Sequence, residues 1–251
     1  MNFNGKTAIV TGAASGMGLL FSQNFARLGG NVVMSDINKG TLDQKADEIN
    51  AEGEGKAIAA VCDVRDYNQV CRVRDTTVCT FGSIDVMVNF AGGAELRMLN
   101  AGGTEFPDTP IEVFDWGIDV NLKGQFYFDH AVLKQMREQK SGVIINIGSI
   151  TGEEGSKSNV AYSTSKSGVM HGLTKSVAMY GSKYGIRCVC VSPGPVLTRP
   201  GMASMKTALG YAAEPQEIID MILYLISDSA RSITGVNFLL DGGRNFLTNK
   251  E

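Results

Sequence analysis

Short apolar runs rich in β-branched residues alternate along this chain with longer stretches in which apolar residues recur at helical spacing. The short runs are typical of buried strands and the longer stretches of amphipathic helices. We predict about seven strands, which include residues 7–10, 31–36, 56–62, 84–88, 143–147, the run around Cys188 and Cys190, and 236–240. Predicted helices cover about residues 19–28, 39–52, 66–81, 111–138, 161–183 and 215–227. Alternation of this kind predicts one α/β domain over residues 1–251, with a doubly wound parallel sheet and helices on both faces.

A glycine-rich turn follows the first strand. It contains Gly12, Gly16 and Gly18, with Ser15 and Met17 between them, and it leads into a helix. Glycines let the backbone approach a pyrophosphate closely, and a helix N-terminus adds amide donors and the positive end of a dipole. The spacing is GxxxGxG rather than the general GxGxxG dinucleotide fingerprint. A tight turn without a ligand is the alternative interpretation.

Asp36 ends the second strand, eighteen residues after Gly18. A carboxylate at this place is expected to accept hydrogen bonds from the hydroxyls of an adenosine ribose. It would repel a 2′-phosphate, and neither position 15 nor position 37 carries a Lys or Arg that would offset the repulsion. The turn and Asp36 together therefore predict NAD as the cofactor. The alternative is that Asp36 caps the following helix.

Ser149, Tyr162 and Lys166 form the candidate chemical site. Ser149 follows an apolar strand, where open α/β sheets place their ligands. Tyr162 and Lys166 are four residues apart and so share one face of a predicted helix. We expect the ammonium to lower the pKa of the phenol, and the serine hydroxyl to donate to a carbonyl or alkoxide oxygen, which suits alcohol–ketone proton transfer. A solvated helix face is the alternative interpretation of the Tyr–Lys pair alone.

The composition is that of an ordinary globular protein, with 43% hydrophobic and 20% charged residues. A net charge of −3 argues against a nucleic-acid surface, and no apolar run is long enough to cross a bilayer. The N-terminus runs straight into a strand, which leaves no room for a signal peptide. Five cysteines, an odd number, favour a reducing compartment, so we expect a cytoplasmic protein. With two histidines and no CxxC we expect no metal site, and we interpret Cys188 and Cys190 as core residues.

Taken in order, the motifs resemble those of the classical short-chain dehydrogenase/reductase family over nearly the whole chain. The residues that carry the resemblance are Thr11-Gly12-x-x-x-Gly16-x-Gly18, Asp63-Val64, Asn89-x-Ala91-Gly92, Asn121, Ser149, Tyr162-x-x-x-Lys166, Pro193-Gly194 with Thr198, and Asp241-Gly242-Gly243. The resemblance implies a Rossmann-type fold, an NAD cofactor and a homotetramer with two-fold interfaces built from the helices near 111–138 and 161–184. Both helices carry apolar residues on more than one face, which independently suggests that a partner covers them.

The resemblance also implies a role for each matching residue. Asn121, Ser149, Tyr162 and Lys166 would form the catalytic tetrad, in which Asn121 supports a water between Lys166 and bulk solvent. Lys166 would also bind the nicotinamide ribose. The implied cofactor contacts are Gly12, Ser15, Gly16, Met17, Gly18, Asp36, Ile37, Asp63 and Val64 at the adenine side, and Asn89, Ala91, Gly92, Tyr162, Lys166, Pro193, Gly194, Val196 and Thr198 towards the nicotinamide.

Two segments depart from the family pattern. Phe90 replaces the second Asn of the usual Asn-Asn-Ala-Gly, and the polar, glycine-containing segment 93–110 is longer than usual. This segment shapes substrate access or is a surface loop without a role. The methionine-containing segment 199–213, the substrate lid of the family, is several residues short.

We therefore expect an NAD(H)-dependent oxidoreductase that interconverts a small-molecule secondary alcohol and its ketone. A 3-oxoacyl thioester or a hydroxysteroid would use the same chemistry. A non-oxidoreductase of this fold and a non-catalytic NAD-binding regulator are the rival hypotheses, which the intact glycine-rich turn and the complete tetrad disfavour. The substrate and the physiological direction stay open.

Overall fold

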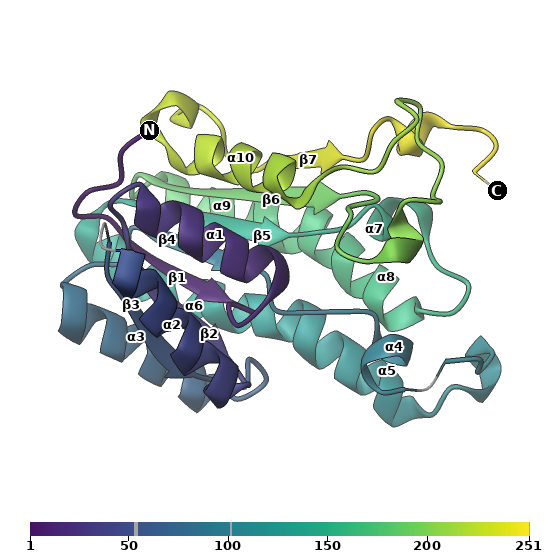
Figure 1. Cartoon of the computed structure of the whole chain (residues 1–251), viewed down its shortest axis with the longest axis horizontal. Coiled ribbons are helices and arrows are strands. Elements are labelled where there is room, and N and C mark those ends of the chain that lie inside the picture. Colours follow the sequence, from purple (N-terminus) through teal and green to yellow (C-terminus); the bar gives the residue numbers. More distant parts are fainter. Residues whose placement is uncertain (53–54, 101, 251) are drawn as a thin grey trace.

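Within residues 1–52, 55–100 and 102–250, which the computed structural model describes, seven parallel strands form a single sheet (Figure 1). The spatial order is β3-β2-β1-β4-β5-β6-β7. The strands are β1 Thr7–Thr11, β2 Asn31–Asp36, β3 Ala57–Val61, β4 Val86–Asn89, β5 Gly142–Ile147, β6 Ile186–Pro193 and β7 Asn237–Leu240. Each neighbouring pair is parallel, as the alternation of strands and helices predicts.

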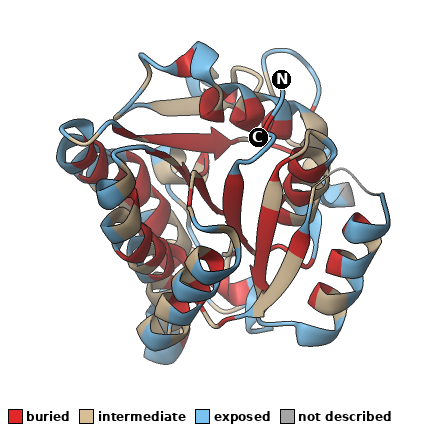
Figure 2. Ribbon diagram, turned by 90° about the vertical axis from the view of Figure 1, so that its left-hand side faces the viewer, coloured by how far each residue is buried: buried red, intermediate tan, exposed pale blue. Residues whose placement is uncertain are grey.

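The sheet separates two hydrophobic clusters because successive side chains of a strand point to opposite faces. In β1, for example, Ala8 and Val10 pack into one cluster and Ile9 into the other. Strands that are covered on both faces read as continuous apolar runs, and the run 7–10 shows this pattern. Figure 2 shows the buried sheet at the centre and exposed residues on the outer sides of the helices.

In the described part of the chain, three helices contribute to the cluster on each face. One cluster contains residues of α1 (Gly16–Arg27), α2 (Lys39–Glu52) and α10 (Pro215–Ile226). The other contains residues of α3 (Tyr67–Phe81), α6 (Gly124–Gln139) and α9 (Thr174–Ser182). The doubly wound α/β fold with helices on both faces is therefore confirmed.

Two of the predicted helices are built from more pieces than the periodicity indicates. The region 111–138 comprises α5 (Ile111–Ile118), a π-helical turn (Asp119–Lys123) and α6. The region 161–183 comprises α8 (Val160–Ser167), a second π-helical turn (Gly168–Leu173) and α9. The short helices α4 (Glu95–Met98) and α7 (Thr151–Glu154), and 3₁₀ turns at Phe106–Asp108, Pro200–Met202, Asp228–Ala230 and Arg244–Phe246, lie in the loops.

The strand order reverses between β1 and β4. From β1 the chain adds β2 and β3 on one side, and from β4 it adds β5, β6 and β7 on the other. Open α/β sheets bind ligands at such a switch point, outside the carboxyl ends of the strands. The end of β1 and the segment after β4 meet there, since Ala91 N donates to Thr11 Oγ1 at 3.1 Å. In the part of the chain that the structure describes, no helix is long and apolar enough to span a membrane.

Candidate active site

The glycine-rich turn is packed closely against its neighbours. A Cβ at Gly18 would lie 2.3 Å from Gly12 O, which excludes a side chain there. Gly12 has a φ of +65° and its Cβ would lie 3.0 Å from Ala91 N, so a side chain there would be strained. Gly16 has a φ of +56° and open space around its missing Cβ. α1 begins at Gly16 rather than at about residue 19, so Gly16, Met17 and Gly18 form its first turn, and the N-cap Ser15 makes no side-chain cap. The residues present therefore fit a dinucleotide phosphate, which would receive the first amides of α1.

Asp36 lies beside this turn. Its Oδ2 accepts from Ala14 N at 3.1 Å and its Oδ1 from Asn38 N at 3.0 Å. The second bond supports the alternative interpretation of Asp36 as a turn residue before α2, and the first ties the carboxylate to the glycine-rich turn. Asp36 is only partly buried, so its carboxylate is placed where a ribose could reach it.

Further along the same edge, the Arg65 guanidinium pairs with Asp63 and holds the pKa of that carboxyl below its ordinary value. Val64 is buried, whereas Ile37 is 71% exposed. The Asp63 side chain is thus engaged with Arg65, and Val64 packs into the hydrophobic cluster that contains residues of α3, α6 and α9.

Lys166 is the most deeply buried cation of the site, with 3% of its surface exposed. Its Nζ donates to Ile147 O at 2.7 Å and lies 5.5 Å from the centroid of the Tyr162 ring. Burial lowers the pKa of this ammonium to about 8. A Cβ at Gly92 would lie 3.7 Å from Nζ, so the first residues after β4 also lie close to this amine.

The Ser149 side chain lies close enough to Tyr162 to lower the pKa of its hydroxyl, and Ser149 Oγ accepts from Thr151 N at 3.2 Å. Burial nevertheless raises the pKa of the Tyr162 hydroxyl above its ordinary value. The Ser149 side chain and the charges of Arg199 and Arg97 lower this pKa, but each effect is smaller than that of burial. The prediction of a lowered pKa is therefore wrong for the chain by itself, because desolvation of the phenolate outweighs the favourable charges.

Asn121 is fully buried in the π-helical turn between α5 and α6. Its side chain accepts from Gly93 N at 2.9 Å and donates to Gly93 O at 3.0 Å and to Gly117 O at 2.9 Å. The π turn explains how an Asn persists where helix propensity disfavours it, and such turns are frequent at functional sites. Asn121 therefore holds the segment after β4 against α5.

Sequence reasoning missed Gln125. This buried side chain donates to Asn121 O and to Ile147 O, each at 3.1 Å, and accepts from Ile147 N at 3.1 Å. Since Ile147 O also accepts from Lys166, Gln125 connects Asn121 to Lys166 through one carbonyl. In the sequence, only its position one helical turn after Asn121 could have indicated that Gln125 belongs to the site.

Sequence reasoning also missed Glu95. It is 2% exposed, and its two carboxylate oxygens accept from Ala161 N at 2.9 Å and from Tyr162 N at 3.1 Å. The N-cap of α8, Asn159, makes no side-chain cap. A carboxylate from the segment 93–110 thus caps the helix that carries Tyr162, which gives part of that segment a structural role.

Asn89 does not present its side chain to the crevice. It is 1% exposed and donates to Asp129 Oδ1 at 2.8 Å and to Asn146 Oδ1 at 2.9 Å, in the core under α6. Asn146 donates to the other oxygen of Asp129 at 2.9 Å. Burial raises the pKa of Asp129 to about 7. Phe90 lies in the opposite cluster, with its ring 6.1 Å from that of Phe21, so it adds packing rather than a polar contact.

The residues after β6 close the other side of the site. A Cβ at Gly194 would lie 2.5 Å from Asp241 Cα, and Gly194 N donates to Leu240 O, which packs Pro193-Gly194 tightly against the end of β7. Val196 bridges to Ala213, and Thr198 Oγ1 donates to Val196 O at 3.4 Å. The segment 196–213 is thereby tied down at both ends.

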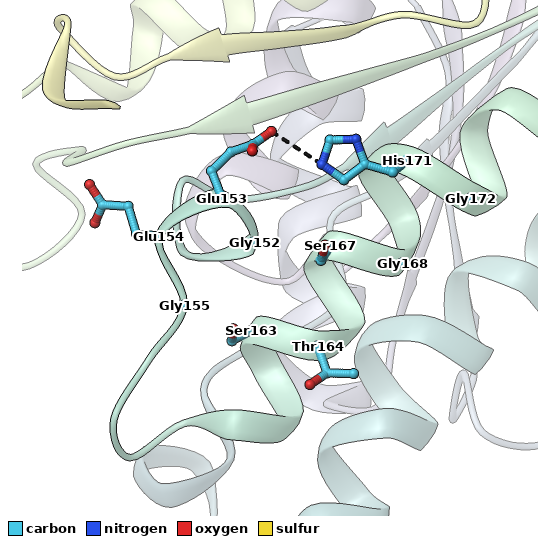
Figure 3. A pocket seen from close by; sticks show the side chains of 10 residues that line it. All are labelled: Gly152, Glu153, Glu154, Gly155, Ser163, Thr164, Ser167, Gly168, His171 and Gly172. Atoms are coloured by element: carbon cyan, nitrogen blue, oxygen red, sulfur yellow. Dashed lines mark ion pairs between the residues drawn. The ribbon is translucent and has the colours of Figure 1, made fainter. Parts of the chain in front are cut away.

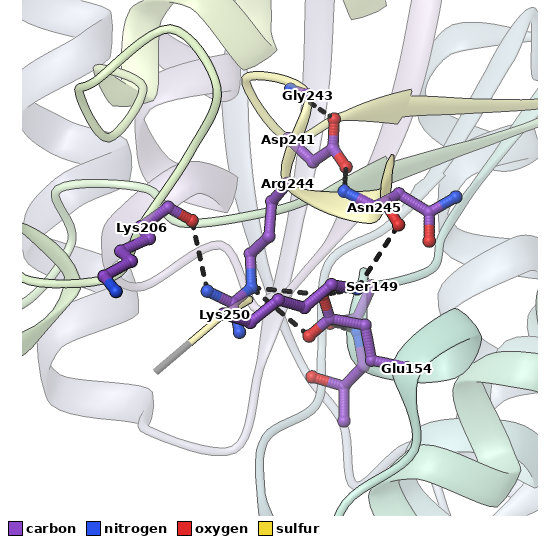
Figure 4. A network of polar contacts seen from close by, with 9 residues as sticks. Ser149, Glu154, Lys206, Asp241, Gly243, Arg244, Asn245 and Lys250 are labelled. Atoms are coloured by element: carbon purple, nitrogen blue, oxygen red, sulfur yellow. Dashed lines mark hydrogen bonds and ion pairs between the residues drawn. The ribbon is translucent and has the colours of Figure 1, made fainter. Parts of the chain in front are cut away.

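A charged cluster connects the segment 196–213 to the C-terminal segment (Figure 4). Glu154, shortly after Ser149, pairs with Arg244 at 3.1 Å and with Lys250 at 2.8 Å. Arg244 also donates to Lys206 O at 3.1 Å, and Asp241 accepts from Gly243 N and Asn245 N. Three segments that are remote in the sequence therefore meet beside Ser149.

A hollow of about 690 Å³ opens on the outer side of α7 and α8 (Figure 3). Its lining includes Ser163, Ser167 and the ion pair of His171 with Glu153 at 3.2 Å. None of the four tetrad residues lines it. The candidate site lies on the opposite, inner side of α8, because Tyr162 and Lys166 point inward from the helix that lines the hollow.

The sheet, the crevice at its switch point and the polar cluster beside it define a doubly wound nucleotide-binding α/β protein. The short chain dehydrogenase family model matches residues 6–208, and the chain belongs to this family. It is thus an oxidoreductase of a family whose relatives are named dehydrogenases and reductases, which confirms the resemblance predicted from the motifs.

Relatives with different substrates are similarly close. The chain is 38% identical to a trans-4-hydroxycyclohexanecarboxylate dehydrogenase of Sinomonas cyclohexanicum, over 95% of this chain and 92% of that protein. It is also 38% identical to a 3-alpha-(or 20-beta)-hydroxysteroid dehydrogenase of Mycobacterium tuberculosis, over 95% and 89%. A crystal structure of a Brucella melitensis 3-oxoacyl-[acyl-carrier protein] reductase with bound NAD superposes with a TM-score of 0.86 and 29% identity, over 96% and 91%.

Proposed function

We propose that this protein interconverts a secondary alcohol and its ketone with NAD(H) as the cofactor. The carrying observation is the convergence of Ser149, Tyr162 and Lys166 at the carboxyl end of β5, beside a glycine-rich turn that excludes side chains. The turn would hold the pyrophosphate of the cofactor through the first amides of α1. When bound, the nicotinamide accepts or supplies the hydride of the reaction.

The residues of this chain move the proton. Tyr162 is positioned to take the hydroxyl proton of an alcohol or to return one to a ketone oxygen, while Ser149 donates a hydrogen bond to that oxygen. Lys166 retains its proton at neutral pH, since its lowered pKa of about 8 is still above 7. Its charge then favours the phenolate that forms during the reaction. Asn121 positions Gly93 and, through Gln125, the carbonyl of Ile147 that holds Lys166.

NAD rather than NADP is proposed because of Asp36. Its carboxylate stands beside the glycine-rich turn, where a ribose 2′-hydroxyl can donate to it and a 2′-phosphate would be repelled. The structural relative with bound NAD supports a nicotinamide cofactor. An L-rhamnose 1-dehydrogenase named for both NAD and NADP is 34% identical, so relatedness alone does not select between the two.

The named relatives support two narrower alternatives with the same chemistry. A 3-oxoacyl thioester is suggested by the acyl-carrier-protein reductases and a hydroxysteroid by the hydroxysteroid dehydrogenases. Hydrophobic side chains exposed on the lid, such as Leu209 and Tyr211, suit either substrate. A regulator without turnover would have no need for the buried Lys166 and its partners.

We further propose a cytoplasmic homotetramer. The helices predicted to form its interfaces expose apolar residues in the single chain: Phe126 is 47% exposed on α6, and Met179 is 79% exposed on α9. α6 and α9 contact each other, so these two exposed side chains belong to neighbouring helices. A second copy would cover these faces with one repeated patch.

Turnover by Tyr162→Phe tests the proposal. Reduction of a panel of ketones is followed at 340 nm with NADH, and NADH binding is measured by its fluorescence. We expect Tyr162→Phe to lose nearly all turnover and to bind NADH as the wild type does, because the hydroxyl alone is removed. Turnover by the variant at more than a few percent of the wild-type rate would remove Tyr162 from the proton step.

A further inference from the structure

We propose that Gln125 is a positioning residue of the reaction, which holds Lys166 in place through the backbone carbonyl of Ile147. This inference deepens the proposed function, on which it rests, because it names a further residue that the proton step requires. It starts from the end of β5, where one carbonyl is shared between an amide side chain and the buried amine.

The ladder between β4 and β5 ends one residue before Ile147. Its last pair is Asn89 with Asn146. The next amide that could continue the ladder, Ala91 N, donates instead to Thr11 Oγ1 at 3.1 Å. In the described chain, the segment after β4 therefore supplies no backbone donor to Ile147 O. A buried carbonyl at such a place takes its donors from elsewhere.

Gln125 supplies one of these donors from α6. Its Nε2 donates to Ile147 O and to Asn121 O, each at 3.1 Å, and its Oε1 accepts from Ile147 N at 3.1 Å. A primary amide has two N–H donors and one carbonyl oxygen, so all of its groups are engaged. The opposite orientation would place its oxygen against two carbonyls, so these partners fix the amide. The side chain is 2% exposed, which keeps water from competing for the bonds.

Lys166 depends on the carbonyl that Gln125 fixes. Its Nζ donates to Ile147 O at 2.7 Å, and among the described residues no other hydrogen-bond acceptor holds this amine. A turn of the carbonyl would therefore move Nζ. Because Nζ lies 5.5 Å from the centroid of the Tyr162 ring, the movement would change how the charge acts on the phenol. Gln125 thus acts on the proton step through Ile147 and Lys166.

The other end of α6 carries a similar amide clamp, by which we mean a glutamine amide bonded to both the N–H and the carbonyl of one residue. Gln139 Nε2 donates to Ile84 O at 3.0 Å, and its Oε1 accepts from Ile84 N at 2.9 Å. Ile84 precedes β4, so this clamp lies at the amino ends of the strands, away from the candidate site. Gln139 therefore separates the structural cost of losing an amide clamp from an effect on Lys166.

The kinetics of two methionine variants test the proposal. Gln125→Met keeps a flexible side chain of similar length and removes the amide, and Gln139→Met is the matched control. We expect the kcat for ketone reduction with NADH to fall at least about tenfold in Gln125→Met, since a 1 Å misplacement can cost about 100-fold. The KM for the ketone should stay nearly unchanged. Gln139→Met should lose thermal stability and keep the wild-type kcat.

Acetylation of Lys166 tests the positioning without turnover. The folded proteins are treated with acetic anhydride, and mass spectrometry gives the rate at each lysine. We expect Lys166 to react about fivefold faster or more in Gln125→Met, a ratio that one lost hydrogen bond accounts for. Gln139→Met should keep the wild-type rate at Lys166. If Gln125→Met does not fold, Gln125→Asn, with its amide one methylene shorter, should show the same changes in smaller measure.

Equal losses of kcat in the two methionine variants would overturn the proposal, because Gln125 would then have a structural role only. Unchanged kcat and acetylation in Gln125→Met would overturn it as well. A loss of kcat without faster acetylation of Lys166 would refute the route through Ile147. Faster acetylation in a protein whose wild type reduces no ketone would leave the positioning of Lys166 and refute the oxidoreductase chemistry.

Discussion

Glu95 offers the sharpest test of how the site is assembled, because a single carboxylate connects the segment after β4 to the helix of Tyr162. Its two bonds to the amides of Ala161 and Tyr162 are charge-assisted and lie in a buried place. A hydrogen bond to a charged group contributes about 1.5–3 kcal/mol. Removal of both should therefore lower the free energy of unfolding by about 3 kcal/mol or more.

Two substitutions separate the effect of the negative charge of Glu95 from the effect of its side-chain volume. Glu95→Ala removes both acceptors, and we expect its Tm to fall by about 6–12 °C, from about 2–4 °C per kcal/mol in a chain of this size. Glu95→Gln keeps one acceptor oxygen and presents an NH₂ to the second amide, so we expect roughly half of that loss. A displacement of Tyr162 by 1 Å can cost about 100-fold in rate, so kcat should fall in both variants while the Kd for NADH stays unchanged.

The measurements are thermal melts, a denaturant series and steady-state kinetics of ketone reduction with NADH. Glu105→Gln is the matched control, since Glu105 is exposed in the same segment and its side chain caps no helix. Wild-type stability and kcat in Glu95→Gln would refute the argument that this carboxylate positions Tyr162. A loss of stability with an unchanged kcat would reduce Glu95 to a structural residue.

Three further predictions follow from other parts of the chain. Asp36→Ala should narrow the preference for NADH over NADPH, as measured by the two dissociation constants, and tighter NADPH binding by the wild type would contradict the role of Asp36. Because the pKa of Asp129 is raised to about 7 in the folded chain, the stability that its neutral form contributes is present below about pH 4 and is lost as the pH rises to about 7. Urea titrations between pH 5 and 7.5 should therefore show the stability of the wild type falling relative to Asp129→Asn, and parallel profiles would refute this. Light scattering should give a tetramer that Met179→Lys and Phe126→Lys weaken, and a monomeric wild type at micromolar concentration would refute the assembly.

Local patterns were enough to predict the fold and most of its elements. The strands of the sheet are apolar runs because both faces are covered, and the glycines of the first turn are required by contacts as close as the 2.3 Å that a Cβ at Gly18 would have with Gly12 O. The spacing of Tyr162 and Lys166 placed both on one helix face, where the structure has them. Each of these features depends on neighbours within one or two turns of the chain, which is the range over which a periodic pattern carries information.

What the tertiary structure decided concerns burial and contacts between remote segments. Glu95 meets the amide of Tyr162 across 67 residues of sequence, and no spacing rule connects an acid in a loop to that helix. The sign of the Tyr162 pKa shift was wrong because a sequence shows the charge four residues away but not the desolvation, which is the larger effect here. Asn89 carries a family motif, yet its side chain lies in the core with Asp129 because β4 and α6 pack there. Chain order therefore determined which elements form and roughly where the site lies, whereas the packing of those elements determined which polar groups are buried and how strongly they interact.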